Sequence, residues 1–330
     1  MRRDNYRIFS EGKIGNLTLR NRLVRSATWD PSILKKGKMT DEVLNLYRKI
    51  ALGGVGLIIS GGFPVFQEKR LIENSKDWIA NYTDLRVNGI EKMPRTVHNS
   101  DQECKIIAQL ENGNLAARPS VINSPHSRRK LRPLTLEEIS DIIDCFVEAI
   151  IDMKKNGFDG IQLHAAHGGL LSRFLSPYTN RRNDTYGGST SKRAKIIHEI
   201  VNKARKSVGD FPILIKMNCT DYIEGGINIE NFPDLAQEIE QTSVDAIEVS
   251  GGMWECLFRS ENELGFRPIP APESHTRIKN PKKQSYFLKF TERLNLNVPV
   301  ILVGGNRDIE RLEEIVSESK VEFIALSRPL

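Results

Sequence analysis

Cysteine is scarce in this chain of 330 residues, which holds only Cys104, Cys145, Cys219 and Cys256. The four lie far apart in the sequence and form no CxxC pair. This spacing argues against a zinc site, an iron–sulphur cluster or a framework of disulfide bonds. We therefore expect ordinary reduced thiols and no metal site.

Long apolar runs are missing as well. No stretch approaches the roughly 20 apolar residues that a membrane-spanning helix needs. The chain begins MRRDNYRIFSEGKIG, where basic residues have no apolar core behind them, so the layout of a secretory signal is also absent. The prediction is a cytoplasmic protein with no membrane partner.

Strong charge of one sign is also absent. The chain has 48 Lys and Arg against 42 Asp and Glu, a net charge of +6 that is spread along its length. The densest basic cluster, SRRKLR at 127–132, has no aromatic residues beside it that could stack on bases. A solvated loop is the favoured interpretation, and nucleic acid is not an expected partner. Contact of this cluster with an anionic cofactor or substrate stays open.

Apolar segments of strand length are what the chain does have. The run VGLII at 55–59 is continuous, which is typical of a strand buried on both faces of a parallel sheet. Eight such segments, separated mostly by helical patterns, predict an α/β protein with a closed (β/α)8, or TIM, barrel rather than an open doubly wound sheet. We expect one domain over 1–330, with strands that begin at Leu23, Val55, Lys105, Phe158, Pro212, Ala246, Val298 and Val321.

Helices and long loops fill the intervals between these strands. Thr135 and Glu138 form a capping box that begins a helix ending near Asn156. The other helices are expected at 40–53, 191–208, 229–242, 284–294 and 309–319. Long irregular loops are expected after the second strand (61–104), the fourth strand and the sixth strand (253–283), and barrel loops of this kind often cover a site.

The fourth strand ends at two histidines, His164 and His167. Barrel enzymes keep their chemistry at the carboxyl ends of the strands, so this pair is a candidate catalytic group. From the residues alone the pair is compatible with a metal site or with acid–base chemistry. A second candidate lies at the end of the chain, where Gly304 and Gly305 follow the seventh strand and Ser327 and Arg328 follow the eighth. Barrels often bind phosphate there, although a glycine pair also suits any tight turn.

The motifs around these positions resemble the old yellow enzyme family of FMN-dependent NAD(P)H oxidoreductases over nearly the whole chain. The most specific match is HAAHG from His164, followed by FLSP from Phe174, NRR from Asn180, Asp184, and YGGS from Tyr186. Supporting matches are LRNR at 19–22, GVGLII at 54–59, Gln109 with Leu110, and the Gly304 and Ser327 ends. No GxGxxG follows a strand, so a Rossmann unit is not expected.

The resemblance implies that FMN lies across the carboxyl-terminal mouth of the barrel. Lys216 would place a positive charge near flavin N1 and O2, where it stabilises the reduced flavin, and Gln109 would bind the pyrimidine edge. The histidines would donate hydrogen bonds to the carbonyl oxygen of an α,β-unsaturated substrate. The other implied FMN contacts are Ser26, Ala27, Thr28 and Ser60 or Gly61 along the ring, and Gly304, Gly305, Ser327 and Arg328 at the phosphate.

Three departures from the family pattern bear on mechanism. Relatives commonly carry a tyrosine two residues after the second histidine, which protonates the substrate α-carbon, and this chain has Gly169. After Gln109 and Leu110 the chain reads ENGN at 111–114, where a histidine, a glycine and an arginine are usual. The sequence also stops at Leu330, where relatives continue into a closing helix, so we expect that helix to be missing.

The predicted activity is reduction of an activated C=C bond in a small-molecule substrate, with NADH or NADPH as the electron donor and FMN as the cofactor. One alternative is a TIM-barrel lyase or isomerase, in which the Gly304 turn binds the phosphate of a metabolite. A non-catalytic flavin-binding protein is the other, suggested by Gly169 and the short carboxyl end. The oligomeric state, including a homo-oligomer, stays open.

Overall fold

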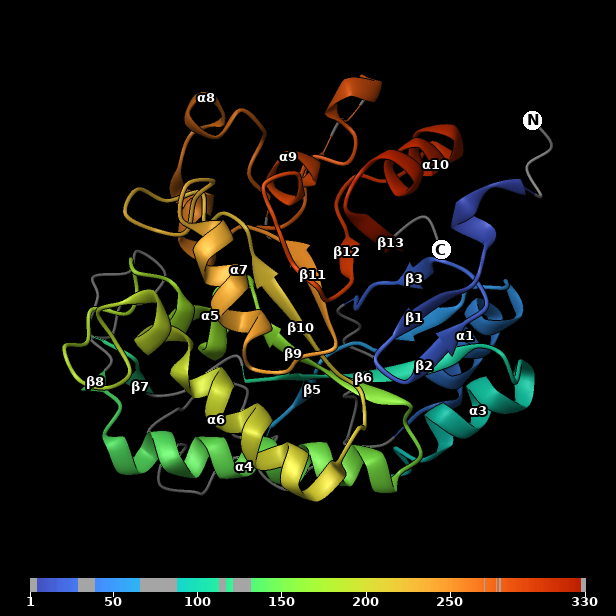
Figure 1. The fold of residues 1–330 in the computed structure, drawn as a ribbon, viewed down its shortest axis with the longest axis horizontal. Helices are drawn as coiled ribbons and strands as arrows, with labels where there is room; N and C mark the ends of the chain where they lie inside the picture. Colours follow the sequence, from blue (N-terminus) through green and yellow to red (C-terminus); the bar gives the residue numbers. More distant parts are fainter. Residues whose placement is uncertain are drawn as a thin grey trace.

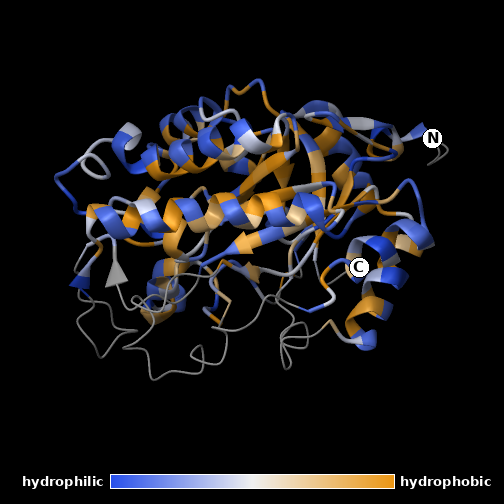
Figure 2. Cartoon of the chain, turned by 90° about the horizontal axis from the view of Figure 1, so that it is seen from below, coloured by the Kyte–Doolittle hydropathy of each residue, from blue (hydrophilic) through white to orange (hydrophobic). Residues whose placement is uncertain are grey.

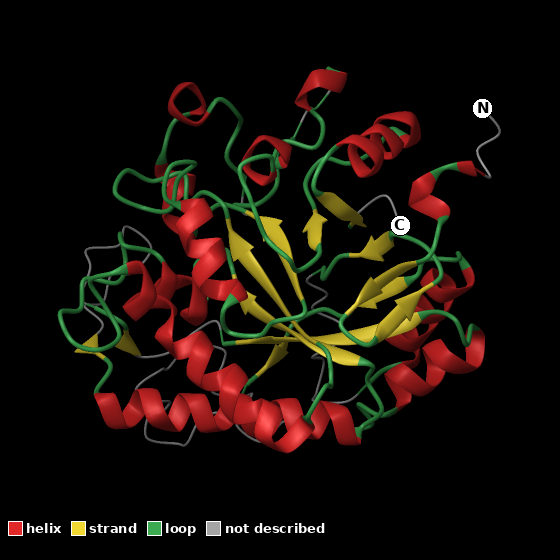
Figure 3. Cartoon of the chain, viewed as in Figure 1, coloured by secondary structure: helices red, strands yellow, loops and turns green. Residues whose placement is uncertain are grey.

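A closed ring of eight parallel strands forms the centre of the protein (Figure 1, Figure 3). The computed structural model describes residues 5–28, 39–65, 88–112, 117–120, 132–269, 271–276, 278 and 280–327. Strand β4 (Leu57–Ile59) pairs with β3 (Leu23–Arg25) on one side and with β6 (Lys105–Glu111) on the other, which closes the ring. The other five strands are β9 (Gly160–Ala165), β10 (Ile213–Asn218), β11 (Ala246–Ser250), β12 (Val300–Leu302) and β13 (Val321–Leu326). The predicted barrel is confirmed, and each predicted strand starts within two residues of its observed position.

Apolar side chains fill the inside of the barrel. Successive side chains of a strand point to opposite faces, so every second residue faces inward. One buried cluster contains Ile107, Leu214 and Ile301 from three strands. Ile14 and Leu19 belong to the same cluster and come from a hairpin of β1 (Gly12–Ile14) and β2 (Leu17–Leu19). The hairpin contacts Phe323 and Asp245, near the starts of β13 and β11, and therefore closes the amino-terminal end of the barrel.

A larger apolar layer lies between the strands and the surrounding helices. Figure 2 shows hydrophobic colour concentrated on the strands, while the helices carry both colours because one side of each faces the barrel. The helices of this layer match the predicted segments, and Thr135 with Glu138 makes the expected capping box. They are α1 (Asp41–Leu52), α4 (Leu136–Lys155), α6 (Thr190–Val208), α7 (Phe232–Glu240) and α10 (Ile309–Glu318).

One predicted helix is much shorter than expected. The segment 284–294 contains only α9 (Leu288–Thr291), preceded by the 3-10 turn η6 (Pro281–Lys283). Ser285 interrupts the segment with a φ of 49°, which a right-handed helix cannot accommodate. Its hydroxyl donates a hydrogen bond to Asn306 Oδ1 at 2.8 Å, so a tertiary contact accompanies the break.

Several short elements lie within segments that were predicted to be irregular. The insertion after β4 contains α3 (Lys92–Ser100) and β5 (Phe63–Pro64), which pairs with β6. The loop after β9 contains α5 (Leu170–Leu175), and the loop after β11 contains η5 (Trp254–Phe258) and α8 (Glu261–Leu264). The remaining short elements are η2 (Arg7–Phe9) and the strand pair β7 (Ala117–Arg118) and β8 (Arg132–Pro133).

None of the helices in the described part of the chain is both long enough and apolar enough to cross a bilayer. The prediction that the closing helix is missing concerns the end of the chain. Residues 328–330 lie outside the described residues, so it stays a prediction. The predicted single domain over the full length stays a prediction.

Candidate active site

A cavity of about 500 Å³ opens among residues at the carboxyl ends of the barrel strands. Most of the residues predicted for the site line it together, although they come from six different parts of the chain. These residues are Ser26, Ala27, Gln109, His164, His167, Lys216, Gly304, Gly305 and Ser327. Lining residues that the sequence analysis did not single out are Gly62, Ser250, Glu273, Ser274, Tyr286, Phe287, Val303, Asn306, Arg307, Ala325 and Leu326. Glu111, named only as a departure from the family pattern, also lines it.

The two histidines stand next to each other, with ring centroids 5.1 Å apart. His167 has a left-handed backbone (φ 58°), and its N–H donates to Asn218 Oδ1 at 3.1 Å, which helps to hold the turn that follows β9. Its ring Nε2 lies 2.7 Å from Ser250 Oγ. Nδ1 of His164 is buried and has no hydrogen-bond partner among the described residues.

Both imidazoles are neutral at physiological pH. Burial, followed by the charges of His167 and Lys216, holds the pKa of His164 well below its ordinary value, and burial with Lys216 does the same to the pKa of His167. A neutral imidazole keeps one N–H donor and one acceptor nitrogen. The part of the chain that the structure describes contains no group of three His, Cys, Asp or Glu side chains that could hold a metal ion.

A layer of polar side chains crosses the barrel directly below the cavity. Glu248 Oε1 accepts a hydrogen bond from Ser26 Oγ at 2.6 Å and lies 3.2 Å from Lys216 Nζ, which also donates to Ser26 Oγ at 3.0 Å. Gln162 Nε2 donates to the other oxygen of Glu248 at 2.7 Å. The Lys216 and Glu248 side chains are 5% and 0% exposed, so this ion pair is buried.

Period-two alternation explains the position of this layer. Ile107, Leu214 and Ala246 belong to the apolar cluster inside the barrel, and the residues two positions later, Gln109, Lys216 and Glu248, lie one level higher. Glu248 and Gln162 were not predicted from the sequence. A signal was available for Glu248, because it is the one charged residue inside an otherwise apolar strand segment.

Gln109 is held from two sides. Its side-chain Nε2 donates to Gln162 Oε1 at 2.7 Å, and its backbone N–H donates to Ser60 Oγ at 3.1 Å. Ser60 is fully buried and donates its hydroxyl proton to Gly61 O at 2.9 Å. Ser60 therefore helps to hold the backbone of Gln109 from the neighbouring strand.

The other end of the cavity is a turn of two glycines beside two hydroxyl groups. Gly304 and Gly305 have φ values of 110° and 73°, which favour glycine. A Cβ at Gly304 would lie 2.7 Å from the ring of Tyr286, and one at Gly305 would lie 2.8 Å from it, so this aromatic packing also requires glycine. Thr28 Oγ1 lies 2.9 Å from Ser327 Oγ, and Thr28 also contacts the Arg25 guanidinium. The predicted contact Arg328 lies outside the described residues.

Glu111 and Gly169 are the two positions near the histidines at which the chain departs from the family pattern. Glu111, at the end of β6, lines the cavity, and burial raises the pKa of its carboxyl group. A Cβ at Gly62 would lie 2.6 Å from Glu111 Cδ, so Gly62 makes room for this side chain. Gly169 has an ordinary backbone (φ −62°, ψ 171°), and a Cβ there would lie 3.6 Å from His164 Cδ2. The backbone therefore does not require glycine at this position.

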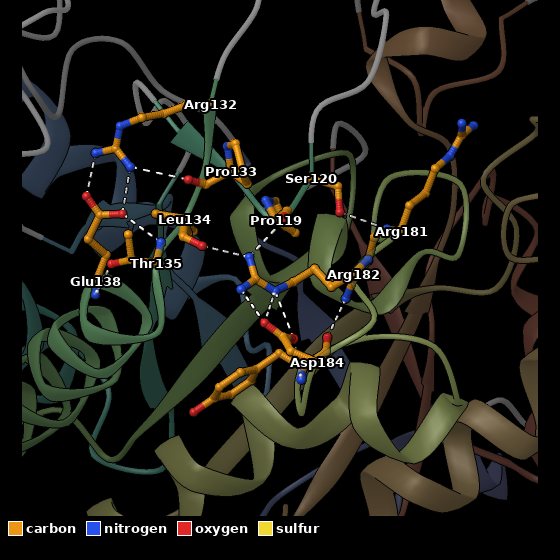
Figure 4. A network of polar contacts seen from close by, with 12 residues as sticks. Pro119, Ser120, Arg132, Pro133, Leu134, Thr135, Glu138, Arg181, Arg182 and Asp184 are labelled. Atoms are coloured by element: carbon orange, nitrogen blue, oxygen red, sulfur yellow. Dashed lines mark hydrogen bonds and ion pairs between the residues drawn. The ribbon is translucent and has the colours of Figure 1, made fainter.

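The signature residues after the histidines hold a loop in place. Arg182 Nη1 donates to the carbonyl oxygens of Pro119 at 2.9 Å and Leu134 at 2.7 Å, and the guanidinium also pairs with Asp184 (Figure 4). Asn180 Nδ2 donates to the carbonyl oxygens of Phe174 and Tyr186, both at 2.7 Å. These motif residues bind backbone rather than line the cavity.

The loop after β11 reaches the cavity through a stack of rings. His275 lies between Phe266 and Tyr286, with centroid distances of 3.6 Å and 3.8 Å and interplanar angles of 18° and 16°. Burial, together with the charge of Lys289, lowers the pKa of His275 to about 4. Glu273 and Ser274 from the same loop line the cavity, as expected for a loop that covers the site.

A sequence model of the NADH:flavin oxidoreductase / NADH oxidase family matches residues 7–330. The chain belongs to this family. The resemblance to the old yellow enzyme family seen in the sequence is thereby confirmed. Among curated members, the NADH oxidase of Thermoanaerobacter brockii is 32% identical over 339 residues, which cover 98% of this chain and 49% of that protein. The NADPH dehydrogenase of Listeria welshimeri is 35% identical over 254 residues, 74% of this chain and 73% of that protein.

Solved structures share the fold of this family member. A 2-naphthoyl-CoA reductase complex superposes with a TM-score of 0.78 at 23% identity, over 98% of this chain and 50% of that one. Morphinone reductase gives a TM-score of 0.67 at 20% identity, over 100% and 87% of the two chains. The chain spans about half the length of the first curated relatives it matches, which include the NADH oxidase and a metal reductase.

Proposed function

We propose that the chain is an FMN-dependent oxidoreductase that takes electrons from NADH or NADPH and reduces the activated C=C bond of an α,β-unsaturated carbonyl compound. The observation that carries the proposal is one cavity in which two neutral histidines stand beside a buried lysine and an amide, with a glycine turn and hydroxyl groups at the far end. Membership of the family supports the cofactor and the electron donor.

The residues of the cavity fit FMN. Its volume of about 500 Å³ lies within the usual range for a cofactor site. Lys216 and Gln109 offer a cation and an amide to the polar edge of the isoalloxazine ring. At the other end, the Gly304 and Gly305 turn, Ser327 and the guanidinium of Arg307 suit a phosphate.

Held by Lys216, Gln109 and the Gly304 turn, FMN would supply the hydride chemistry between the nicotinamide and the β-carbon of the substrate. The protein's part is to bind and polarise the substrate. His164 and His167 would donate N–H groups to the carbonyl oxygen, where negative charge develops in the transition state. Neutral imidazoles suit this role, because they retain a donor without adding a buried charge. Donation by Ser250 Oγ to Nε2 of His167 would leave the ring proton of His167 on Nδ1.

The test is anaerobic reduction of the FMN-loaded protein with NADPH or NADH, followed by mixing with cyclohex-2-enone. We expect both steps to proceed, and we expect H164A/H167A to keep FMN but to lose about 10²-fold or more in the enone step, the usual cost of removing such donors. H198A, which changes an exposed histidine on α6, is the matched control and should behave like the wild type. Unchanged turnover in H164A/H167A would overturn the role of the histidines.

Other outcomes would favour the alternatives. Protein that binds no FMN but turns over a phosphorylated metabolite would indicate a lyase or isomerase. Flavin that is bound but not reduced by either nicotinamide would indicate a non-catalytic flavin-binding protein. The cytoplasmic location stays a prediction from the sequence, and the physiological substrate and the oligomeric state stay open.

A further inference from the structure

Glu248 is a fully buried carboxylate at the centre of the polar layer below the cavity. It comes from the middle of β11, between Ile247 and Val249, where the strand is otherwise apolar or small. Burying a carboxylate is costly unless the charge is paired and both oxygens are hydrogen-bonded. Here one oxygen contacts Ser26 and Lys216, and the other accepts from Gln162, so both are used.

The carboxylate sets the direction of a chain of two amides. An ionised carboxylate only accepts hydrogen bonds, so Gln162 must turn its Nε2 toward Glu248. Gln162 Oε1 then faces Gln109, which must donate through its own Nε2 at 2.7 Å. One N–H of Gln109 Nε2 is used on Gln162, and the side-chain oxygen of Gln109 is the acceptor that this chain of amides leaves unused. Gln109 is thus presented as an acceptor, which matches an N–H group on the pyrimidine edge of a flavin.

The carboxylate of Glu248 also offsets the positive charge that Lys216 brings to the cavity. Lys216 lines the cavity, and its ammonium group lies 3.2 Å from Glu248. At such a distance the carboxylate offsets part of the field of the ammonium group. A bound cofactor would therefore interact with an ion pair and not with an isolated cation.

We propose that Glu248 is a positioning residue of the cofactor site, which fixes Gln109 as a hydrogen-bond acceptor and offsets the charge of Lys216. It acts through these two residues on the affinity and reduction potential of FMN. The inference rests on the proposed function, because it presumes that FMN occupies the cavity.

Two variants separate the two effects. E248Q removes the charge, so the protein should bind reduced FMN about tenfold better relative to oxidised FMN, which corresponds to a rise of about 30 mV in a two-electron potential. Q162M interrupts the amide chain without changing charge. It should weaken FMN binding about tenfold. The ratio of the affinities for reduced and oxidised FMN, which sets the potential, should stay within about threefold of the wild-type ratio. The measurements are FMN titration of the apoprotein and an equilibrium redox titration of the loaded protein.

The conservative variant E248D keeps the charge and should restore the wild-type potential, which loss of structure alone would not do. Thermal unfolding checks that each variant folds. If E248Q does not fold, K216M/E248Q is compared with K216M. K216M keeps the charge of Glu248, whereas the double variant has neither charge, so the double variant should show the higher potential. An unchanged or lower potential in E248Q, or unchanged FMN affinity in Q162M, would overturn the inference. Wild-type protein that binds no FMN would instead overturn the proposed function and this inference with it.

Discussion

His275 gives a stability change that can be calculated from the structure. Its ring is stacked between Phe266 and Tyr286, and its pKa falls from an ordinary 6.5 to about 4. In the unfolded chain the imidazole binds a proton as the pH falls through 6.5, whereas in the folded protein it stays neutral until about pH 4. The folded state therefore loses stability between these two values. From pH 8 to pH 5 the loss is about 2 kcal/mol.

Urea unfolding of the wild type and H275F at pH 8 and pH 5 measures this loss. Phenylalanine keeps an aromatic ring in the stack but cannot bind a proton, so H275F should lose about 2 kcal/mol less than the wild type over this pH interval. H198A, which removes an exposed histidine of α6, is the control for the loss of a histidine as such. Equal pH dependence in the wild type and H275F would refute the assignment of a half-buried, neutral His275 in the ring stack.

Two glycine substitutions test the glycine turn of the cavity at Gly304 and the position beside His164 at Gly169. G304A should destabilise the protein by about 2 kcal/mol more than G188A in urea unfolding, because both positions have positive φ but only Gly304 has rings within 2.7 Å of the added Cβ, whereas Gly188 has nothing within 4 Å. Equal losses would show that the Tyr286 and Phe287 rings move aside. G169Y should fold like the wild type, because the backbone at Gly169 is ordinary and the Cβ contact with His164 is an ordinary one. The added phenol should speed the enone step about tenfold or more if a missing acid limits it, and an unchanged rate would show that proton supply is not limiting.

The strands and most helices could be predicted because their signals are local. Apolar runs mark the buried strands, and Thr135 with Glu138 marks the start of α4. The short length of α9 could not be predicted, because the left-handed backbone of Ser285 interrupts the helical pattern. The hydroxyl of Ser285 contacts Asn306, which lies in another part of the chain. Helix α3 was missed because it is short and includes a proline.

The residues of the candidate site also include some that the sequence predicts and some that only the structure identifies. His164, Lys216 and Gln109 were predicted from motifs, and the barrel brings them into one cavity. Glu248 and Gln162 were missed, because their contacts depend on which residues of neighbouring strands face inward at the same level. The Gly304 and Gly305 pair was explained in the sequence by phosphate binding or by a tight turn, whereas the structure adds close packing against Tyr286.

The most direct test of the proposed function is the visible absorbance spectrum of the FMN-reconstituted protein before and after anaerobic addition of NADH or NADPH. The cavity that contains Lys216, Gln109 and the two histidines predicts a bound flavin band that survives gel filtration and bleaches with at least one nicotinamide. A protein that retains no flavin, or retains flavin that neither nicotinamide bleaches, would contradict it.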